Sequence, residues 1–227
     1  MANTIANPTG GFQAFGRMEG GSPTAGLTPA WISSTDALAI WRGDPVISCP
    51  SSLYGTGGSG AYITSVQNSS DGNPLRGIFQ GCEYYQPTVG RVVWSNTWPG
   101  TVTGSTGDIR AYVIDDPQQV FLAQASTGAA LTSSFVNLNV NITTNTISTL
   151  GNVQTGLSNA TLGASTVTSS NLRQFRIVDF YSAYAPPGVP AVGTAAFVNG
   201  TDNTTPANMV IVRLNNCDRL SLTARSS

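Results

Sequence analysis

The chain has 227 residues, a formal net charge of −1 and no histidine, and all ten of its basic residues are arginine. This length can bury a sizeable core, and a hydrophobic fraction of 40% argues against disorder throughout. Charged residues make up only 9%, against about 25% in ordinary soluble proteins, so solubility must come from neutral polar groups. A neutral polar surface is buried against a partner at a lower desolvation cost than a charged one, which favours a protein with large contacts.

The missing residue types exclude most familiar kinds of active site. Without histidine, the usual Ser-His-Asp and Cys-His mechanisms and histidine-ligated zinc are excluded. Without lysine, so are the Schiff-base nucleophile and the lysine of a phosphate-binding loop. Only two glutamates, Glu19 and Glu83, add to the aspartates. We therefore expect no enzyme, no cofactor and no metal.

Charge and hydropathy patterns also restrict the partners. The arginines are scattered rather than gathered in a basic patch, so we expect no nucleic-acid partner. No run of about 18 apolar residues is present, and the first residues lack the basic and apolar regions of a signal peptide, so we expect neither a membrane helix nor secretion. Cys49, Cys82 and Cys217 have no metal-binding spacing and are odd in number, which predicts free thiols in a reducing compartment.

The N-terminal segment has no hydrophobic period. Residues 1–30 are rich in Gly, Pro, Thr and Asn, which predicts an extended arm before a single β domain over 31–227. An arm loses conformational entropy when it docks and so needs apolar anchors. We predict that Phe12, Phe15 and Trp31 contact a partner; the alternative, that they fold back on their own domain, stays open.

The following segments read mostly as strands and turns. Residues 33–41 fit either a short helical turn or the start of a strand. Gly55, Gly57 and Gly60 match a dinucleotide-binding pattern, but no helical pattern follows, so a loop or hairpin tip is expected there.

Strand patterns dominate the rest of the chain. Residues 77–85 and 91–96 flank a connection typical of a hairpin, and 135–143 alternates apolar residues with Asn, which predicts a half-buried antiparallel strand. Further strands are predicted at 46–49, 109–114, 119–124, 172–181 and 209–216. A variable excursion near 144–171 and a proline-rich loop at 185–193 interrupt them. The predicted fold is all-β, an antiparallel barrel or sandwich with long loops and an extended N-terminal arm.

An acidic pair closes one of these strands. Asp115 and Asp116, followed by Pro117, predict a turn in which proline fixes φ and the aspartates cap backbone N–H groups. The alternatives are a cation site assisted by Asp108 or Glu83, and a hydrolytic carboxylate pair. Replacing both aspartates by Asn is expected to cost modest stability and to leave partner binding nearly intact.

The tryptophans near predicted turns also allow two interpretations. Trp94 and Trp98 fit a packed corner better than a sugar-stacking platform, and Trp41 is predicted to lie in the core.

Several blocks together resemble a known family. They are GGFQAFG at 10–16, RGDPVISC at 42–49, RGIFQGCEYY at 76–85, WSNTWPG at 94–100, RAYVIDDPQQVFLAQ at 110–124 and VIVRLNN at 210–216. In this order they resemble the capsid cement, decoration or minor head structural proteins of tailed bacteriophages, over roughly residues 10–216. The segment 144–171 and the C-terminal tail depart from that pattern.

The resemblance implies a structural role on the virion. Such proteins sit on the outer surface of the expanded icosahedral capsid, bridge major capsid protein subunits and resist the pressure of packaged DNA. They act as small homo-oligomers, either dimers or trimers, and are assembled in the host cytoplasm. The competing hypothesis is a phage surface β module that binds host glycans.

Overall fold

The computed structural model describes residues 10–22, 26–49, 62–66, 74–103, 107–143, 151–181 and 206–220. Regular structure in these residues is β, with short 3₁₀ helices at Ser133–Phe135 and Ala164–Thr166 and no α-helix. Neighbouring strands within each sheet are antiparallel, so the predicted all-β class is confirmed.

The first sheet has the strand order β1-β10-β13-β12-β11. Its strands are β1 (Gln13–Arg17), β10 (Gln119–Gln124), β13 (Met209–Leu214), β12 (Phe175–Phe180) and β11 (Asn139–Val140). The inward positions of the three central strands are large and apolar, and the predicted strands over 119–124, 172–181 and 209–216 are confirmed apart from their ends.

The second sheet has the order β2-β9-β6-β4-β5, with β7 paired to the far part of β6. Its strands are β2 (Thr28–Ile32), β9 (Ile109–Ile114), β6 (Leu75–Gln86), β4 (Pro45–Ser48), β5 (Ile63–Ser65) and β7 (Arg91–Ser95); β3 (Ile40–Trp41) and β8 (Thr97–Trp98) form a small separate pair. The predicted hairpin is therefore confirmed as β6 and β7. A single bridge between Trp31 and Tyr62 joins the two ends of the strand order, which curls this sheet toward a barrel.

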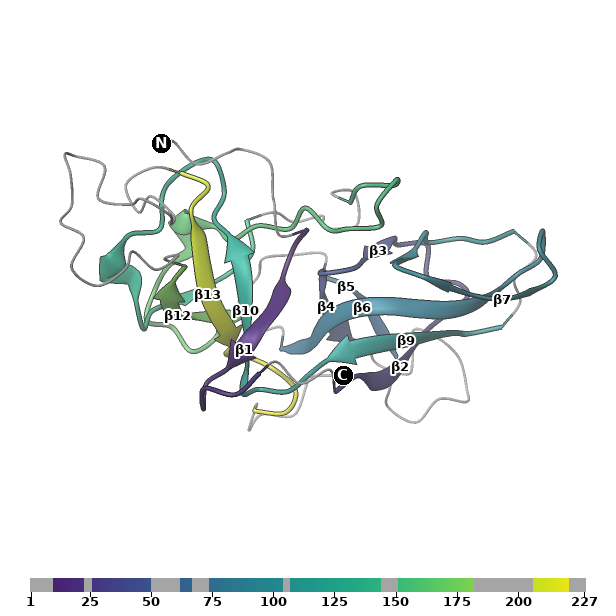
Figure 1. Cartoon of the computed structure of the whole chain (residues 1–227), viewed down its shortest axis with the longest axis horizontal. Coiled ribbons are helices and arrows are strands. Elements are labelled where there is room, and N and C mark those ends of the chain that lie inside the picture. Colours follow the sequence, from purple (N-terminus) through teal and green to yellow (C-terminus); the bar gives the residue numbers. More distant parts are fainter. Residues whose placement is uncertain are drawn as a thin grey trace.

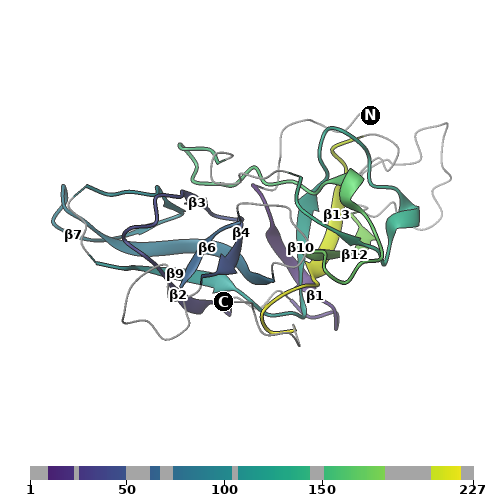
Figure 2. The ribbon, with the colours of Figure 1, turned by 180° about the vertical axis from the view of Figure 1, so that it is seen from behind.

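The two sheets lie side by side and share apolar contacts (Figure 1; Figure 2 from behind). One buried cluster gathers around Phe121, Phe175 and Val212 under the first sheet, and a second around Phe79 and Trp98 under the second sheet. The first cluster also contains Leu75, Ile78 and Ile114, which belong to the second sheet. The sheets are therefore packed together by a common core rather than joined by a linker.

The described part of residues 1–30 contradicts the prediction of an arm without a core. Phe12 is 1% exposed and its ring stacks on Phe175 with centroids 4.4 Å apart, while β1 and β2 pair within the two sheets. The glycines of this segment are needed for close packing: a Cβ at Gly11 would lie 2.6 Å from the carbonyl oxygen of Gly43. Residues 1–9 and 23–25 lie outside the described residues.

The strand predicted over 135–143 is wrong except for its centre. A 3₁₀ turn precedes it, Asn137 has a left-handed φ of 70°, and only Asn139–Val140 pairs as a strand. Two of the asparagines expected on a solvent face, Asn139 and Asn141, are instead buried, and the Asn141 side-chain oxygen accepts the backbone N–H of Gln174 at 2.9 Å. Amide side chains replace the backbone ladder here, which hydropathy alone does not predict.

The excursion near 144–171 is packed where it is described. Residues 151–171 have isolated bridges from Leu157 to Arg42 and from Leu162 to Ala125, and Leu162 is fully buried. The segment 33–41 forms a turn and then enters β3, so it is the start of a strand. The glycine motif at 55–60 and the loop at 185–193 lie outside the described residues.

Candidate functional site

The acidic pair lies where the chain crosses from one sheet to the other. β9 ends at Ile114 in the second sheet and β10 begins at Gln119 in the first. Asp116 accepts the backbone N–H of Gln118 at 2.9 Å, so the predicted capped turn is confirmed. The same carboxylate forms an ion pair with Arg17 of β1 at 3.5 Å.

Asp115 connects more of the chain than a turn requires. Its buried carboxylate lies 3.0 Å from the Arg219 guanidinium and 3.5 Å from that of Arg76, and it accepts the Thr28 hydroxyl at 2.7 Å. These partners come from β6, β2 and the segment after β13. Asp115 therefore links two strands of the second sheet to the segment that follows the last strand of the first sheet.

This arrangement does not support the cation or hydrolase hypotheses for the pair. Two arginines already neutralise Asp115, whereas Asp108 lies at the opposite end of β9 and accepts the Tyr62 hydroxyl at 2.5 Å. Glu83 stands opposite Arg110, also away from Asp115. In the described part of the chain, no three His, Cys, Asp or Glu side chains are grouped so that they could hold a metal ion.

A second buried carboxylate went unnoticed in the sequence. Asp44 is completely buried, accepts the Ser158 hydroxyl at 2.5 Å and the Trp41 backbone N–H at 2.7 Å, and forms no ion pair within the described residues. Burial raises its pKa from 3.8 to about 8, and these two hydrogen bonds only partly oppose the shift. A sequence of Gly43-Asp44-Pro45 indicates a turn and gives no sign of such burial.

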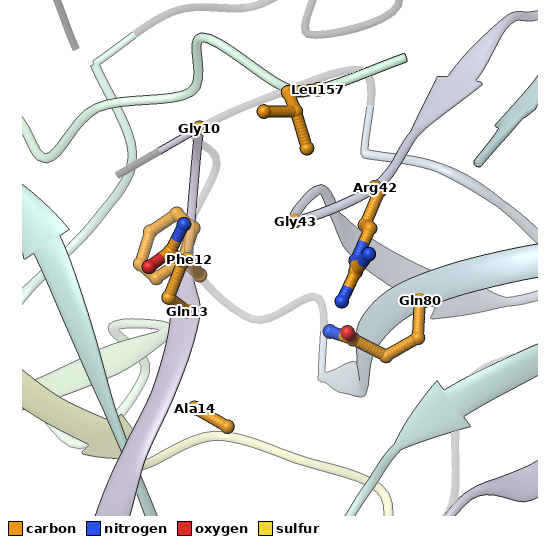
Figure 3. Close-up of a pocket in the computed structure, with 8 residues that line it drawn as sticks. All are labelled: Gly10, Phe12, Gln13, Ala14, Arg42, Gly43, Gln80 and Leu157. Atoms are coloured by element: carbon orange, nitrogen blue, oxygen red, sulfur yellow. The ribbon is translucent and has the colours of Figure 1, made fainter. Parts of the chain in front are cut away.

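A cavity of about 420 Å³ separates the free side of β1 from the second sheet (Figure 3). Arg42 and Gln80 lie close together on one side of it, and Gln13 lines the opposite side beside Phe12. The side chains of Arg42, Gln80 and Gln13 make no hydrogen bond or ion pair with other described residues. They come from three distant segments, so sequence analysis had no means of grouping them.

The three predicted partner contacts have different surroundings. Phe12 lies in the core, so the prediction that it contacts a partner is wrong. Phe15, on β1, is 45% exposed and touches the Tyr181 ring edge-on with centroids 5.8 Å apart. Trp31, on β2, is 44% exposed. These two remain available for contact with another protein.

Trp31 belongs to a row of side chains across the outer face of the second sheet. It stands opposite Arg110 on β9, Arg110 stands opposite Glu83 on β6, and Glu83 stands opposite Trp94 on β7. Residues directly opposite in antiparallel strands project from the same face. We call these four residues, Trp31, Arg110, Glu83 and Trp94, the outer row.

The aromatic side chain at the far end of the row packs against the outer face of the sheet. Trp94 is 52% exposed and packs on Tyr112 with ring centroids 5.2 Å apart. It covers Gly81, whose φ is 145° and where a Cβ would lie 2.5 Å from the indole ring. The packed-corner prediction is confirmed for Trp98, which is fully buried, and is wrong for Trp94; Trp41 is a core residue as predicted.

The three cysteines are free, as their spacing predicts, but are buried where half-buried thiols were expected. Cys49, Cys82 and Cys217 are all free and buried. Burial, assisted by the charge of Glu83, raises the pKa of the Cys82 thiol to about 12, so it is un-ionised and a poor nucleophile at neutral pH.

No protein-family model matches the chain, and no curated protein or solved structure is significantly similar to it. Among the described residues, no helix has the length and apolar character needed to span a membrane.

Proposed function

We propose that this chain is a non-catalytic structural virion protein of a tailed bacteriophage. It binds the outside of the expanded icosahedral capsid, bridges major capsid protein subunits and stabilises the shell against the pressure of packaged DNA. The order of the sequence blocks over residues 10–216 supports this role. The structural observation that carries it is the placement of an exposed aromatic side chain, Phe15, on the outermost strand of the first sheet.

The exposed aromatic groups supply binding energy. Each large apolar side chain contributes about 1.5–3 kcal/mol when its burial is completed, and roughly half of that remains to be gained by a side chain already half buried. Phe15 lies on β1, which pairs only with β10 among the described strands, so its second edge faces the cavity beside Arg42 and Gln80. An extended segment of a capsid subunit can add to such an edge.

A bridging protein must also transmit force between its contacts. The buried Asp115 carboxylate joins β2, β6 and the segment after β13 through Thr28, Arg76 and Arg219. Since the shared core also spans both sheets, a capsid subunit held at β1 would be connected to the second sheet through that core.

The direct test is co-sedimentation of the purified protein with expanded capsids that lack it. We expect saturable binding by the wild type and about tenfold weaker binding by Phe15→Ala, which corresponds to about 1.4 kcal/mol. Val153→Ala, at a highly exposed position outside both sheets, is the matched control and should bind normally. Absence of binding by the wild type would exclude the cement role.

One observation favours a second candidate, the glycan-binding surface module. Trp94 and Tyr112 form adjoining rings on an exposed sheet face, and aromatic faces can stack on sugar rings. A glycan-array signal that disappears in Trp94→Ala, in a protein that does not sediment with capsids, would support this candidate instead.

A further inference from the structure

We propose that the outer row is a twofold interface through which two copies of this chain associate. The row reads tryptophan, arginine, glutamate, tryptophan from β2 through β9 and β6 to β7. Its two ends carry the same residue type and its two central positions carry opposite charges. The inference does not depend on capsid binding, because it concerns the protein alone.

The pattern is self-complementary under one particular symmetry operation. A twofold axis parallel to the strands, between β9 and β6, reverses the order of the row in the facing copy. Arg110 of each copy then meets Glu83 of the other, and Trp31 meets Trp94. Strands of the two sheets remain aligned, as in the common face-to-face packing of β-sheets, and each contact occurs twice, as a twofold interface requires.

The two central charges are available for this contact. Although Arg110 and Glu83 stand directly opposite each other, no ion pair joins them in the described structure. The Arg110 guanidinium lies over the Tyr112 ring, 5.5 Å from its centroid. Tyr112 thus holds the Arg110 guanidinium on the outer face while leaving its hydrogen-bonding capacity open.

The apolar part of the face is large enough to form the centre of an interface. Tyr85 and Val92 stand opposite each other beside the row, and both are exposed, as are Trp31 and Trp94. Aromatic side chains bury about 150–250 Å² each, so the three half-exposed aromatic groups alone offer roughly 300 Å² per copy, toward about 800 Å² per partner in a standard interface. The low charge of the chain keeps the desolvation cost of the surrounding rim small.

The test is sedimentation equilibrium of the full chain with two single charge reversals, Arg110→Glu and Glu83→Arg. Wild type is expected to dimerise. Each variant alone places like charges at both symmetric contacts, and its dissociation constant should rise at least about tenfold. When the two variants are mixed, one copy presents two acidic groups and the other two basic groups, so dimerisation should return as a mixed dimer.

Two controls separate the interface from the fold. Arg91→Glu reverses a charge at the exposed start of β7, outside the row, and should leave association unchanged. The double variant Arg110→Glu/Glu83→Arg should dimerise with itself, and the melting temperatures of the two single variants should agree, since both carry a like-charged pair within the chain. A wild-type monomer or trimer, or a mixture that stays monomeric while both variants remain folded, would overturn the proposal. Because no capsid is present, failure here leaves the capsid-binding test unaffected.

Discussion

Replacing Asp44 by Asn should remove a large pH dependence from the stability of the fold. The Asp44 carboxyl group is fully buried with two hydrogen bonds and no ion pair among the described residues, and its pKa in the folded protein is about 8 against 3.8 ordinarily. Between these two values the folded chain retains a proton that the unfolded chain releases. The free energy of unfolding therefore falls as the pH rises.

The size of the effect follows from the two pKa values. Each unit of difference corresponds to about 1.4 kcal/mol, so a span of about four units gives roughly 6 kcal/mol as an upper limit. Stability from this group is fully present below about pH 4 and is lost progressively as the pH rises to about 8, with no further change above. Since domains of this kind are stable by about 5–15 kcal/mol, the loss should be easily measured.

Asparagine is a close match for the protonated acid. Its side-chain oxygen can accept the Trp41 N–H, and its NH₂ group can donate to the Ser158 hydroxyl oxygen, so the buried contacts survive without a titrating group.

The assay is urea unfolding, followed by tryptophan fluorescence, at intervals from pH 5 to pH 8.5. The wild type should lose stability at about 1 kcal/mol per pH unit, whereas Asp44→Asn should give a nearly flat profile above pH 5. Asp179→Asn, at an exposed carboxylate, should follow the wild type. Parallel profiles for Asp44→Asn and the wild type would refute the assignment of the pH dependence to this group.

Three other substitutions test separate parts of the structure. Phe12→Ala should lower the free energy of unfolding by about 3–5 kcal/mol in urea titrations because it empties a core position, whereas Phe15→Ala should cost less than about 1 kcal/mol; equal losses would contradict the burial difference. Asp115→Asn should cost about 3 kcal/mol, more than the modest loss expected from the sequence, since it leaves two arginine side chains without their carboxylate; a loss below about 1 kcal/mol would show that solvent replaces those contacts. Gly43→Ala should lower the melting temperature by at least about 5 °C, because φ is 93° and the new Cβ would meet a backbone carbonyl; an unchanged melting temperature would refute this.

The parts of the fold that were predicted correctly are those governed by neighbouring residues. The strand at 109–114 is rich in β-branched and aromatic residues, the strand at 119–124 contains Val120 and Phe121, and the Asp and Pro of the turn between them act locally. Which sheet each strand joins was not predictable, because it depends on pairing between distant segments. The strand at 135–143 failed for a local reason: Asn137 adopts a left-handed conformation, and Asn side chains in that segment compete for backbone hydrogen bonds.

The candidate surfaces could not be predicted from the sequence, because they depend on the register between paired strands. The outer row takes one residue from each of four strands, and only the cross-strand pairing places Arg110 between Trp31 and Glu83. Likewise, Asp115 was recognised as part of a turn, but its partner Arg219 lies 104 residues away along the chain. Composition indicated a surface suited to large contacts, and the structure was needed to locate where the apolar groups gather.

The packing of residues 10–32 determines which variants can distinguish a loss of binding from a loss of folding. If residues 1–30 formed the arm that the sequence predicts, deleting them would leave the β domain intact. In the structure the deletion removes β1, most of β2 and the buried ring of Phe12, so a deleted chain that fails to bind capsids would report a damaged core as readily as a lost contact. Phe15 and Trp31 avoid this ambiguity because both are half exposed on strands that stay paired. A loss of capsid binding in Phe15→Ala, with association in solution retained, together with the converse in Trp31→Ala, would assign the two sheets to different partners.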